Sequence, residues 1–138
     1  MRHGPIIFTI LLLACGAKTG EIRTENDEET FDMFIDAFTT DSSFQLTRVK
    51  FPLEIVTWGI DERQTIDKVA SDNWRHLRFE YKTGYATRKI DAYTQEITIS
   101  TDSASISLRG VDNGIRIDYV FKKVEGQWTL MIVRDYSN

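Results

Sequence analysis

The sequence predicts an α+β fold in which helices come first and an antiparallel sheet of about four long strands follows. Near the N-terminus, apolar residues recur at the three- and four-residue spacing of one helix face. From residue 86 onward the spacing changes to two, which is typical of strands with one buried face. Turn residues at 112–114 and 125–126 separate the alternating segments and indicate hairpins.

Length and composition allow one domain of this kind and argue against several classes of protein. The chain has 138 residues, of which 41% are hydrophobic and 28% charged, and its net charge is −4. These values are typical of a globular domain, whereas a nucleic-acid-binding protein would carry a basic surface. The single cysteine excludes an internal disulfide framework and a cysteine-rich zinc site, and we expect no metal and no cofactor.

The first residues predict an export signal and a lipid anchor. A short basic start precedes the apolar residues 5–13, which match a signal-peptide core and fall short of the ~20 residues that span a membrane. The tetrapeptide LLAC that ends in Cys15 resembles the bacterial lipoprotein box, in which the cysteine is lipidated and the residues before it are removed. We expect a signal peptide over 1–14 and a lipidated Cys15; the alternative is an ordinary secretory signal with a free cysteine.

The polar residues 15–26 predict a flexible tether, which leaves 27–138 as a single α+β domain. We therefore expect a protein of the bacterial cell envelope that is held to the membrane through Cys15. Gly16, and not an aspartate, follows the cysteine, and by analogy with enteric lipoproteins this favours the outer membrane. Whether the protein faces the periplasm or the cell exterior stays open.

Two helices are predicted at the start of the domain. Asn26 is a suitable N-cap for the first helix, with Glu29 three residues later as its capping partner. The apolar stripe of this helix, which we assign to the core, consists of Phe31, Phe34, Ile35 and Phe38. Asp41 is expected to cap a second short helix, which carries Phe44, Leu46 and Val49.

The middle of the chain predicts shorter segments. Residues 51–58 predict an extended strand, which Pro52 prevents from being a central strand at that point. After a turn, residues 64–69 predict a short strand or a connector, and residues 71–77 predict a capped helical turn that contains Trp74.

The last hairpin can be paired residue by residue from a two-residue turn at 125–126. The pairs expected on the apolar face are Phe121 with Leu130, Tyr119 with Ile132, Ile117 with Arg134 and Ile115 with Tyr136. The pairs expected on the other face are Val120 with Met131, Asp118 with Val133 and Arg116 with Asp135. The last of these pairs joins opposite charges, which supports the register.

The order of elements and two motifs resemble known families. The closing segment 123–130, with Gly126 and Trp128, resembles the end of the nuclear transport factor 2-like fold. Residues 34–38, 41–53 and the Trp-containing turn at 73–76 resemble a family of lipoproteins of unknown function from Bacteroides-type bacteria. The resemblance covers most of residues 28–138 and implies a cone made of N-terminal helices on a curved antiparallel sheet of about four to six strands, without transferable catalytic residues.

Two groups of residues are candidates for binding. The candidate pocket consists of Trp58, Trp74, Tyr119, Arg134 and Tyr136, where Arg134 could hold an anionic group or reach solvent at the end of the sheet. Exposed aromatic side chains near Trp58 and Trp74 could instead form a platform for a sugar or peptide. The candidate interface consists of Val120, Met131 and Val133, an apolar patch with a charged rim that would suit a homodimer or be covered by another segment of the same chain.

The titratable residues predict little catalysis. Asp36, Asp41 and Asp118 do not fall on the apolar faces, and His76 lies in a polar turn. We expect a non-catalytic module that binds a small ligand or an envelope protein. The alternatives are an isomerase, dehydratase or cyclase that uses an acid in the cone pocket, and an inhibitor or assembly factor that acts through an exposed sheet face.

Overall fold

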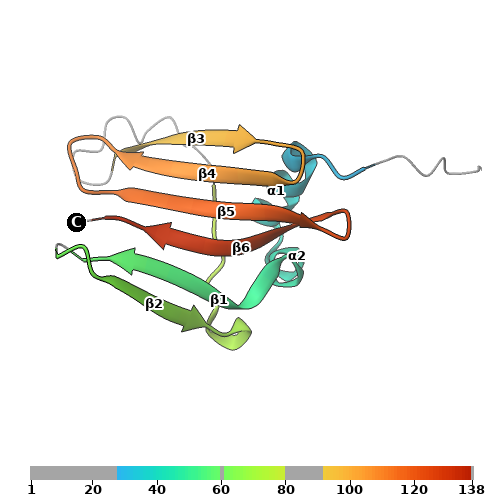
Figure 1. Ribbon diagram of the computed structural model, residues 1–138. Helices are drawn as coiled ribbons and strands as arrows, with labels where there is room; N and C mark the ends of the chain where they lie inside the picture. Colours follow the sequence, from blue (N-terminus) through green and yellow to red (C-terminus); the bar gives the residue numbers. More distant parts are fainter. Residues whose placement is uncertain (1–27, 60, 80–91, 138) are drawn as a thin grey trace, which may run out of the picture.

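The computed structural model describes residues 28–59, 61–79 and 92–137, and it shows two short helices against one face of a curved, open, six-stranded sheet (Figure 1). The helices are α1 (Phe31–Thr40) and α2 (Ser42–Thr47), and a single 3-10 turn, η1, covers Ser71–Asn73. The strands are β1 (Val49–Trp58), β2 (Gln64–Val69), β3 (Tyr93–Ile99), β4 (Ser103–Gly110), β5 (Arg116–Val124) and β6 (Gln127–Asp135). The predicted α+β fold is confirmed, while the expected signal peptide, lipidated cysteine and tether lie outside the described residues.

The strand order β2-β1-β6-β5-β4-β3 brings the first and last strands of the chain together inside the sheet. β1 and β6 pair in parallel, and all other neighbouring strands pair antiparallel. The expectation of a wholly antiparallel sheet is therefore wrong at this one pair. The pairing of β1 with β6 omits the residues between Val49 and Glu54, and Pro52, which has no N–H to donate, lies in that gap.

Paired residues share a face of the sheet, so each face can be followed across the strands. One row of paired residues consists of Ile97, Ile106, Tyr119, Val133 and Ile55. This is the inner face, against which α1 packs, because Phe34 of α1 contacts Phe121, two residues along β5 from Tyr119. Alternate residues form the outer face on the other side of the sheet.

A β-bulge at Met131 changes the register of the last hairpin. The predicted pairing is confirmed from the turn to Phe121 opposite Leu130, but beyond that point Val120 pairs with Ile132 and Tyr119 with Val133. Met131 is thus one extra residue on β6. Because side chains alternate along a strand, one extra residue moves every later side chain of β6 to the other face.

The bulge exchanges the predicted positions of two charged residues. Arg134 was expected on the apolar face but pairs with Asp118 and lies on the outer face. Asp135 was expected on the opposite face but pairs with Ile117 and lies on the inner face. The predicted pairing of Arg116 with Asp135 is wrong for the same reason.

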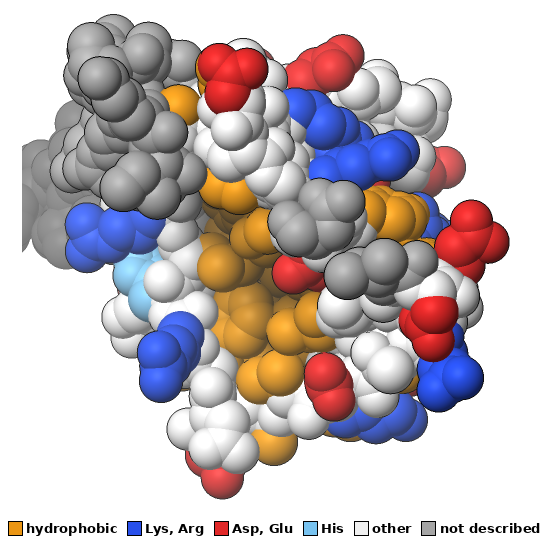
Figure 2. All heavy atoms as spheres, turned by 90° about the vertical axis from the view of Figure 1, so that its left-hand side faces the viewer, with side chains coloured by type: hydrophobic (Ala, Val, Ile, Leu, Met, Phe, Trp, Pro, Cys, Tyr) orange, Lys and Arg blue, Asp and Glu red, His pale blue; other side chains and the backbone are white. Residues whose placement is uncertain are grey.

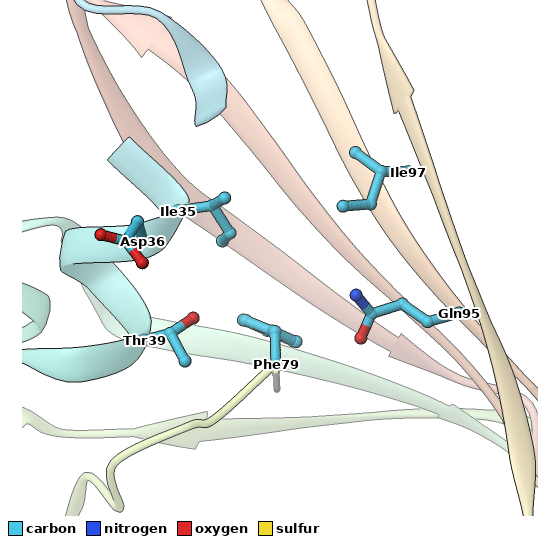
Figure 3. Close-up of a pocket in the computed structure, with 6 residues that line it drawn as sticks. All are labelled: Ile35, Asp36, Thr39, Phe79, Gln95 and Ile97. Carbon is cyan, nitrogen blue, oxygen red and sulfur yellow. The ribbon is translucent and has the colours of Figure 1, made fainter. Parts of the chain in front are cut away.

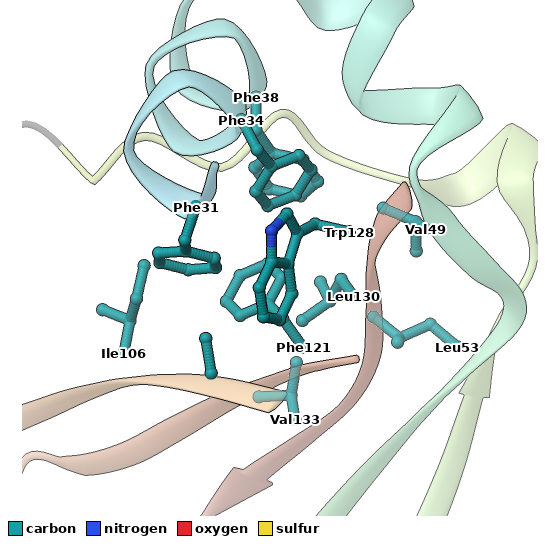
Figure 4. Close-up of a cluster of buried hydrophobic side chains, with 11 residues drawn as sticks. Phe31, Phe34, Phe38, Val49, Leu53, Ile106, Phe121, Trp128, Leu130 and Val133 are labelled. Carbon is teal, nitrogen blue, oxygen red and sulfur yellow. The ribbon is translucent and has the colours of Figure 1, made fainter. Parts of the chain in front are cut away.

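The core lies between α1 and the inner face and combines five aromatic rings with aliphatic side chains of the sheet (Figure 4). Phe31, Phe34 and Phe38 are at most 3% exposed, which confirms that the predicted helix stripe is the core face of α1. The ring of Phe121 meets all three edge-on, with centroid distances of 5.4, 5.6 and 5.7 Å. Trp128, at 2% exposure, packs edge-on against Phe31 and closes the core beside the start of the helix.

The start of α1 differs from the prediction. Thr30 is the N-cap, and its hydroxyl accepts a hydrogen bond from the backbone N–H of Met33, whereas Asn26 lies outside the described residues. Both carboxylate oxygens of Glu29 accept hydrogen bonds from the guanidinium of Arg48 at 2.9 Å. The same carboxylate accepts from the backbone N–H of Trp128 at 2.8 Å, so Glu29 ties the start of α1 to β6.

Asp41 caps α2 as predicted, and its removal provides a test of the helix connection. Its carboxylate accepts hydrogen bonds from the backbone N–H groups of Ser43 and Phe44 at 2.8 and 3.0 Å. Asp41→Ala is expected to lower the free energy of unfolding by about 0.5–2 kcal/mol, because two backbone donors lose their acceptor. Asp41→Asn keeps an acceptor and should lose much less in the same urea titration. An equal loss in both variants would contradict this role of the cap.

Candidate functional site

A pocket of about 240 Å³ lies between α1 and the edge strand β3 (Figure 3). Its lining residues are Ile35, Asp36 and Thr39 from α1, Phe79 from the segment after η1, and Gln95 and Ile97 from β3. Most of the lining surface is apolar. The pocket therefore suits an apolar group that meets a few polar atoms.

Gln45 holds the segment that carries Phe79 against the inner face. Its side chain is fully buried, and its amide nitrogen donates to the carbonyl oxygens of Phe38 and Leu77 at 2.6 and 2.9 Å. Its amide oxygen accepts from the indole N–H of Trp74 at 2.9 Å and from the backbone N–H of Leu77 at 2.8 Å. All four hydrogen-bonding positions of the amide are used, so Gln45 fixes the backbone two residues before the pocket residue Phe79.

Gln95 lines the pocket and carries an unsatisfied polar side-chain atom. Its side-chain oxygen Oε1 is buried and has no hydrogen-bond partner within the described part of the chain. A buried acceptor without a partner costs about 1–3 kcal/mol. A hydroxyl or amide N–H of a ligand in this pocket would satisfy this oxygen only if the Gln95 side chain turned it toward the pocket.

The inner face extends past the helices toward the ends of β4 and β6. Figure 2 views the molecule from that end and shows hydrophobic side chains in a hollow. Leu108 and Ile117 pair at this end of the inner face and are only partly buried. Tyr119 lies one row nearer the helices, and the ring of Phe79 meets it edge-on at a centroid distance of 4.9 Å. Phe79 thus lines the pocket and also contacts Tyr119 on the inner face.

Tyr119 is the titratable group whose environment on the inner face is most unusual. Burial, together with the smaller effects of the negative charge of Asp135 and the nearby Tyr93, raises its pKa from 10.0 to about 12. Asp135 reaches the inner face only because of the bulge at Met131. Tyr119 is therefore a protonated hydroxyl over the whole physiological pH range.

The raised pKa of Tyr119 predicts a loss of stability in alkali. The folded protein holds this proton more tightly than the unfolded chain does, so its contribution is complete below pH 10 and is lost as pH rises toward 12. A near-ultraviolet titration should show one tyrosine ionising later than the others. Tyr119→Phe should remove that late phase and weaken the alkaline loss of stability, and a late phase that persists in this variant would contradict the assignment.

The five residues of the candidate pocket do not come together. Tyr119 lies on the inner face, and Trp74 packs against the core with its ring edge-on to Phe51 at 5.8 Å. Trp58 stacks on Tyr136 at a centroid distance of 4.2 Å. Val56 pairs with Arg134 on the outer face, and Trp58 follows two residues later on that same face. The physical reason is the bulge, which turns Arg134 and Tyr136 away from the inner face.

The candidate interface is also divided by the bulge. Val133 is 7% exposed and belongs to the core on the inner face, so it cannot form an exposed patch. Val120 pairs with Ile132 on the outer face and is half-buried, and Met131 is the extra residue of the bulge. The predicted patch of three residues is therefore reduced on the outer face, where Ile132 supplies apolar surface that the prediction did not include.

The acids considered as catalytic groups have different environments. Asp36 lines the pocket but is exposed, Asp41 caps α2, and Asp118 accepts a hydrogen bond from Arg109 at 2.6 Å. The Nε2 atom of His76 is buried and has no hydrogen-bond partner among the described residues. Within residues 28–59, 61–79 and 92–137 no group of three acidic, histidine or cysteine side chains could hold a metal ion.

Sequence reasoning missed Gln95, Phe79 and Asp135 as parts of the site. Gln95 and Ile97 were visible as alternating residues of a strand, but their pairing with β4 at the edge of the sheet was not. Phe79 is placed by the hydrogen bonds of Gln45, a contact between segments 32 residues apart in sequence. Asp135 depends on the bulge, for which the sequence of β6 carries no turn residue or glycine as a signal.

Comparison with known proteins identifies a family and a fold. The family described as "Domain of unknown function (DUF4348)" matches residues 17–105, which is more than half of the chain. No curated protein matches the chain at a significant level.

Three solved structures from Bacteroides share the fold. A nuclear transport factor 2-like protein of Bacteroides fragilis is 23% identical with a TM-score of 0.57 over 83% of this chain, which spans only 50% of that protein. A cystatin-like protein of Bacteroides caccae is 22% identical with a TM-score of 0.55 over 81% of this chain and 78% of its own. A protein of Bacteroides uniformis is 23% identical with a TM-score of 0.52 over 80% of this chain and 78% of its own. At these identities the likeness shows the fold alone.

Proposed function

The chain belongs to the DUF4348 family of domains of unknown function with a nuclear transport factor 2-like fold, and from this premise we propose that it is a lipid-anchored envelope protein that binds a small, largely apolar ligand. The observation that carries the proposal is the apolar pocket between α1 and β3, with the buried, unpaired oxygen of Gln95 at its wall. An apolar pocket with few polar groups is the usual form of a small-molecule site.

The pocket sets the size and chemistry of the ligand. Sites for drug-sized molecules usually measure about 300–1,000 Å³. A volume of about 240 Å³ therefore suits a smaller molecule or one apolar portion of a larger molecule. Ile35, Phe79 and Ile97 provide the apolar contacts, while Gln95 places a side-chain amide at the wall of the pocket.

The same geometry favours binding over catalysis. A general acid or base must lie within hydrogen-bond distance of the reacting group and be tuned to its task. Asp36 is exposed at the pocket, and Tyr119, with a pKa of about 12, can donate a hydrogen bond but is a poor base at neutral pH. The alternative of an isomerase, dehydratase or cyclase that uses Asp36 would be supported by chemical change of the bound molecule and loss of that change in Asp36→Asn.

Filling the pocket tests the proposal. Ile97→Trp places a larger side chain at the pocket wall and should weaken binding of the neutral fluorescent probe phenylnaphthylamine about tenfold or more. Ile66→Trp is the matched control, because Ile66 is an exposed isoleucine of β2 that pairs with Val56 on the outer face. Equal affinity for the probe in both variants would contradict ligand binding in this pocket.

The proposed location rests on Cys15 and the apolar segment before it. None of the helices in the described part of the chain is long and apolar enough to cross a membrane. We expect Cys15→Ser to abolish incorporation of labelled fatty acid and to release the protein from the membrane fraction, with the outer membrane as the expected site of the anchor. Unchanged labelling in this variant would overturn the lipid anchor without affecting the pocket.

A further inference from the structure

A second pocket of about 300 Å³ lies at the end of the sheet where β4 turns into β5, away from the pocket beside α1. Its lining residues are Arg109, Gly110, Asn113, Gly114, Ile115, Arg116 and Tyr136. The lining is mainly polar and contains two guanidinium groups but no carboxylate side chain. In a chain with a net charge of −4, this is a local excess of positive charge.

The pairing of the strands concentrates arginines around one acid. Arg109 pairs directly with Arg116 across β4 and β5, and Arg134 pairs with Asp118 across β5 and β6. Like charges directly opposite each other in a sheet are destabilising. Asp118 neutralises only part of this charge, because its hydrogen bond goes to Arg109 at 2.6 Å. Within the described residues, Arg116 and Arg134 make no salt bridge.

Both arginines of the pocket are held in place. The guanidinium of Arg109 donates to the carbonyl oxygens of Leu108 and Ile117 at 2.9 and 3.3 Å in addition to Asp118. The guanidinium of Arg116 lies over the ring of Tyr136, 5.1 Å from its centroid. Tyr136 is in turn stacked on Trp58 with an angle of 16° between the rings. Such stacking orients a guanidinium while leaving its N–H groups available.

The stack of Trp58, Tyr136 and Arg116 also limits which ligands the pocket can bind. A sugar or a nucleobase needs a free aromatic face. One face of Tyr136 meets Trp58, and the guanidinium of Arg116 also lies over its ring, so the stack offers little free face for a flat ligand. The groups that remain are N–H donors, which match the oxygens of a carboxylate or a phosphate.

The loop 110–116, which lines the pocket, is held in one conformation by hydrogen bonds of Asn113. The side-chain oxygen of Asn113 accepts from the backbone N–H of Ile115 at 3.1 Å, and its amide nitrogen donates to the carbonyl oxygen of Ala92 at 2.7 Å. A side chain at Gly110 would place its Cβ 1.8 Å from the Asn113 oxygen, so only glycine fits there. The pocket wall is therefore preorganised before any ligand arrives.

We propose that this second pocket binds the carboxylate or phosphate group of a small anionic molecule, with Arg116 as the principal contact and Arg109 as the second. The site is separate from the apolar pocket beside α1, and its occupation does not depend on the function proposed for that pocket.

The test is a titration of the full-length protein in detergent with inorganic phosphate and, separately, with acetate, followed by the backbone N–H resonances of the 110–116 loop. We expect saturable shifts with at least one anion, and an affinity about tenfold or more weaker in Arg116→Gln, because one charge-assisted contact is lost. Arg116→Lys keeps the charge but not the planar fork and should bind with intermediate affinity. The matched control is Arg63→Gln, since Arg63 is an exposed arginine of the β1–β2 turn.

The outcomes separate the sources of the anion. Saturation by phosphate alone supports a phosphate ester as ligand, and saturation by acetate alone supports a carboxylic acid. No saturable shift with either anion would overturn the proposal, as would an equal loss of affinity in Arg116→Gln and Arg63→Gln. The thermal midpoint of each variant is measured alongside, and Arg116→Lys tests the contact independently if Arg116→Gln is unstable.

Discussion

Replacing Phe121 with alanine is expected to lower the free energy of unfolding by about 3–5 kcal/mol, the range for truncation of a buried phenylalanine. Phe121 is fully buried on β5 and meets the rings of Phe31, Phe34 and Phe38 edge-on. Alanine would leave a cavity between the inner face and α1 and would remove all of these ring contacts. Urea unfolding followed by tryptophan fluorescence measures the loss.

The control for this prediction is Phe121→Leu, which keeps most of the apolar volume and should lose much less stability than the alanine variant. The ring of Phe79 also meets Phe121, at a centroid distance of 6.4 Å. The alanine variant should therefore also weaken binding in the pocket that Phe79 lines. A loss below about 1 kcal/mol in Phe121→Ala would show that α1 does not pack on the inner face as described.

Gln45→Leu is expected to lower the free energy of unfolding by about 2–4 kcal/mol even though leucine has a similar volume. Four groups lose their hydrogen-bond partner inside the protein: the carbonyls of Phe38 and Leu77, the N–H of Leu77 and the indole N–H of Trp74. The same buried groups hold the segment before Phe79. Urea unfolding and the binding of phenylnaphthylamine should both be impaired.

Gln64→Leu is the matched control for Gln45→Leu, because it makes the same chemical change at an exposed position of β2. Surface substitutions of this kind usually change stability by less than about 0.5 kcal/mol. A small loss in both variants would contradict the structural role of Gln45. A large loss of stability with normal probe binding would separate its role in folding from its role in placing Phe79.

The local parts of the fold could be predicted because the residues that determine them are close in sequence. The stripe of Phe31, Phe34 and Phe38 follows helical spacing, and Asp41 caps N–H groups that lie only two and three residues later in the chain. The turn at Glu125 and Gly126 sets the first pairs of the last hairpin, where Val124 lies opposite Gln127. Each of these features depends on contacts within a few residues.

The nonlocal parts could not be predicted in the same way. The parallel pairing of β1 with β6 joins segments about 80 residues apart, for example Val49 with Leu130, and alternation within each strand is the same for parallel and antiparallel neighbours. Gln45 is fully buried on a helix whose sequence predicts a polar, exposed residue there. Its burial is stable only because distant backbone groups satisfy its amide.

Met131, the extra residue of the bulge, accounts for most of the difference between the predicted and the observed site. Counting from the turn placed Arg134 inside and Asp135 outside, and the bulge at Met131 reverses both. The inner face is therefore less basic than expected, whereas the outer face gains Arg134 beside Arg109 and Arg116. A one-residue insertion has this effect because the side-chain period of a strand is two.

The central claim is that the pocket between α1 and β3 binds a small, largely apolar molecule, and native mass spectrometry of the protein purified from its own host tests it most directly. The account predicts a retained small molecule that is absent from Ile97→Trp and present in Ile66→Trp. A molecule retained equally by both variants would place the ligand elsewhere. A protein that is bare in every form, even after incubation with an extract of host lipids, would contradict the claim.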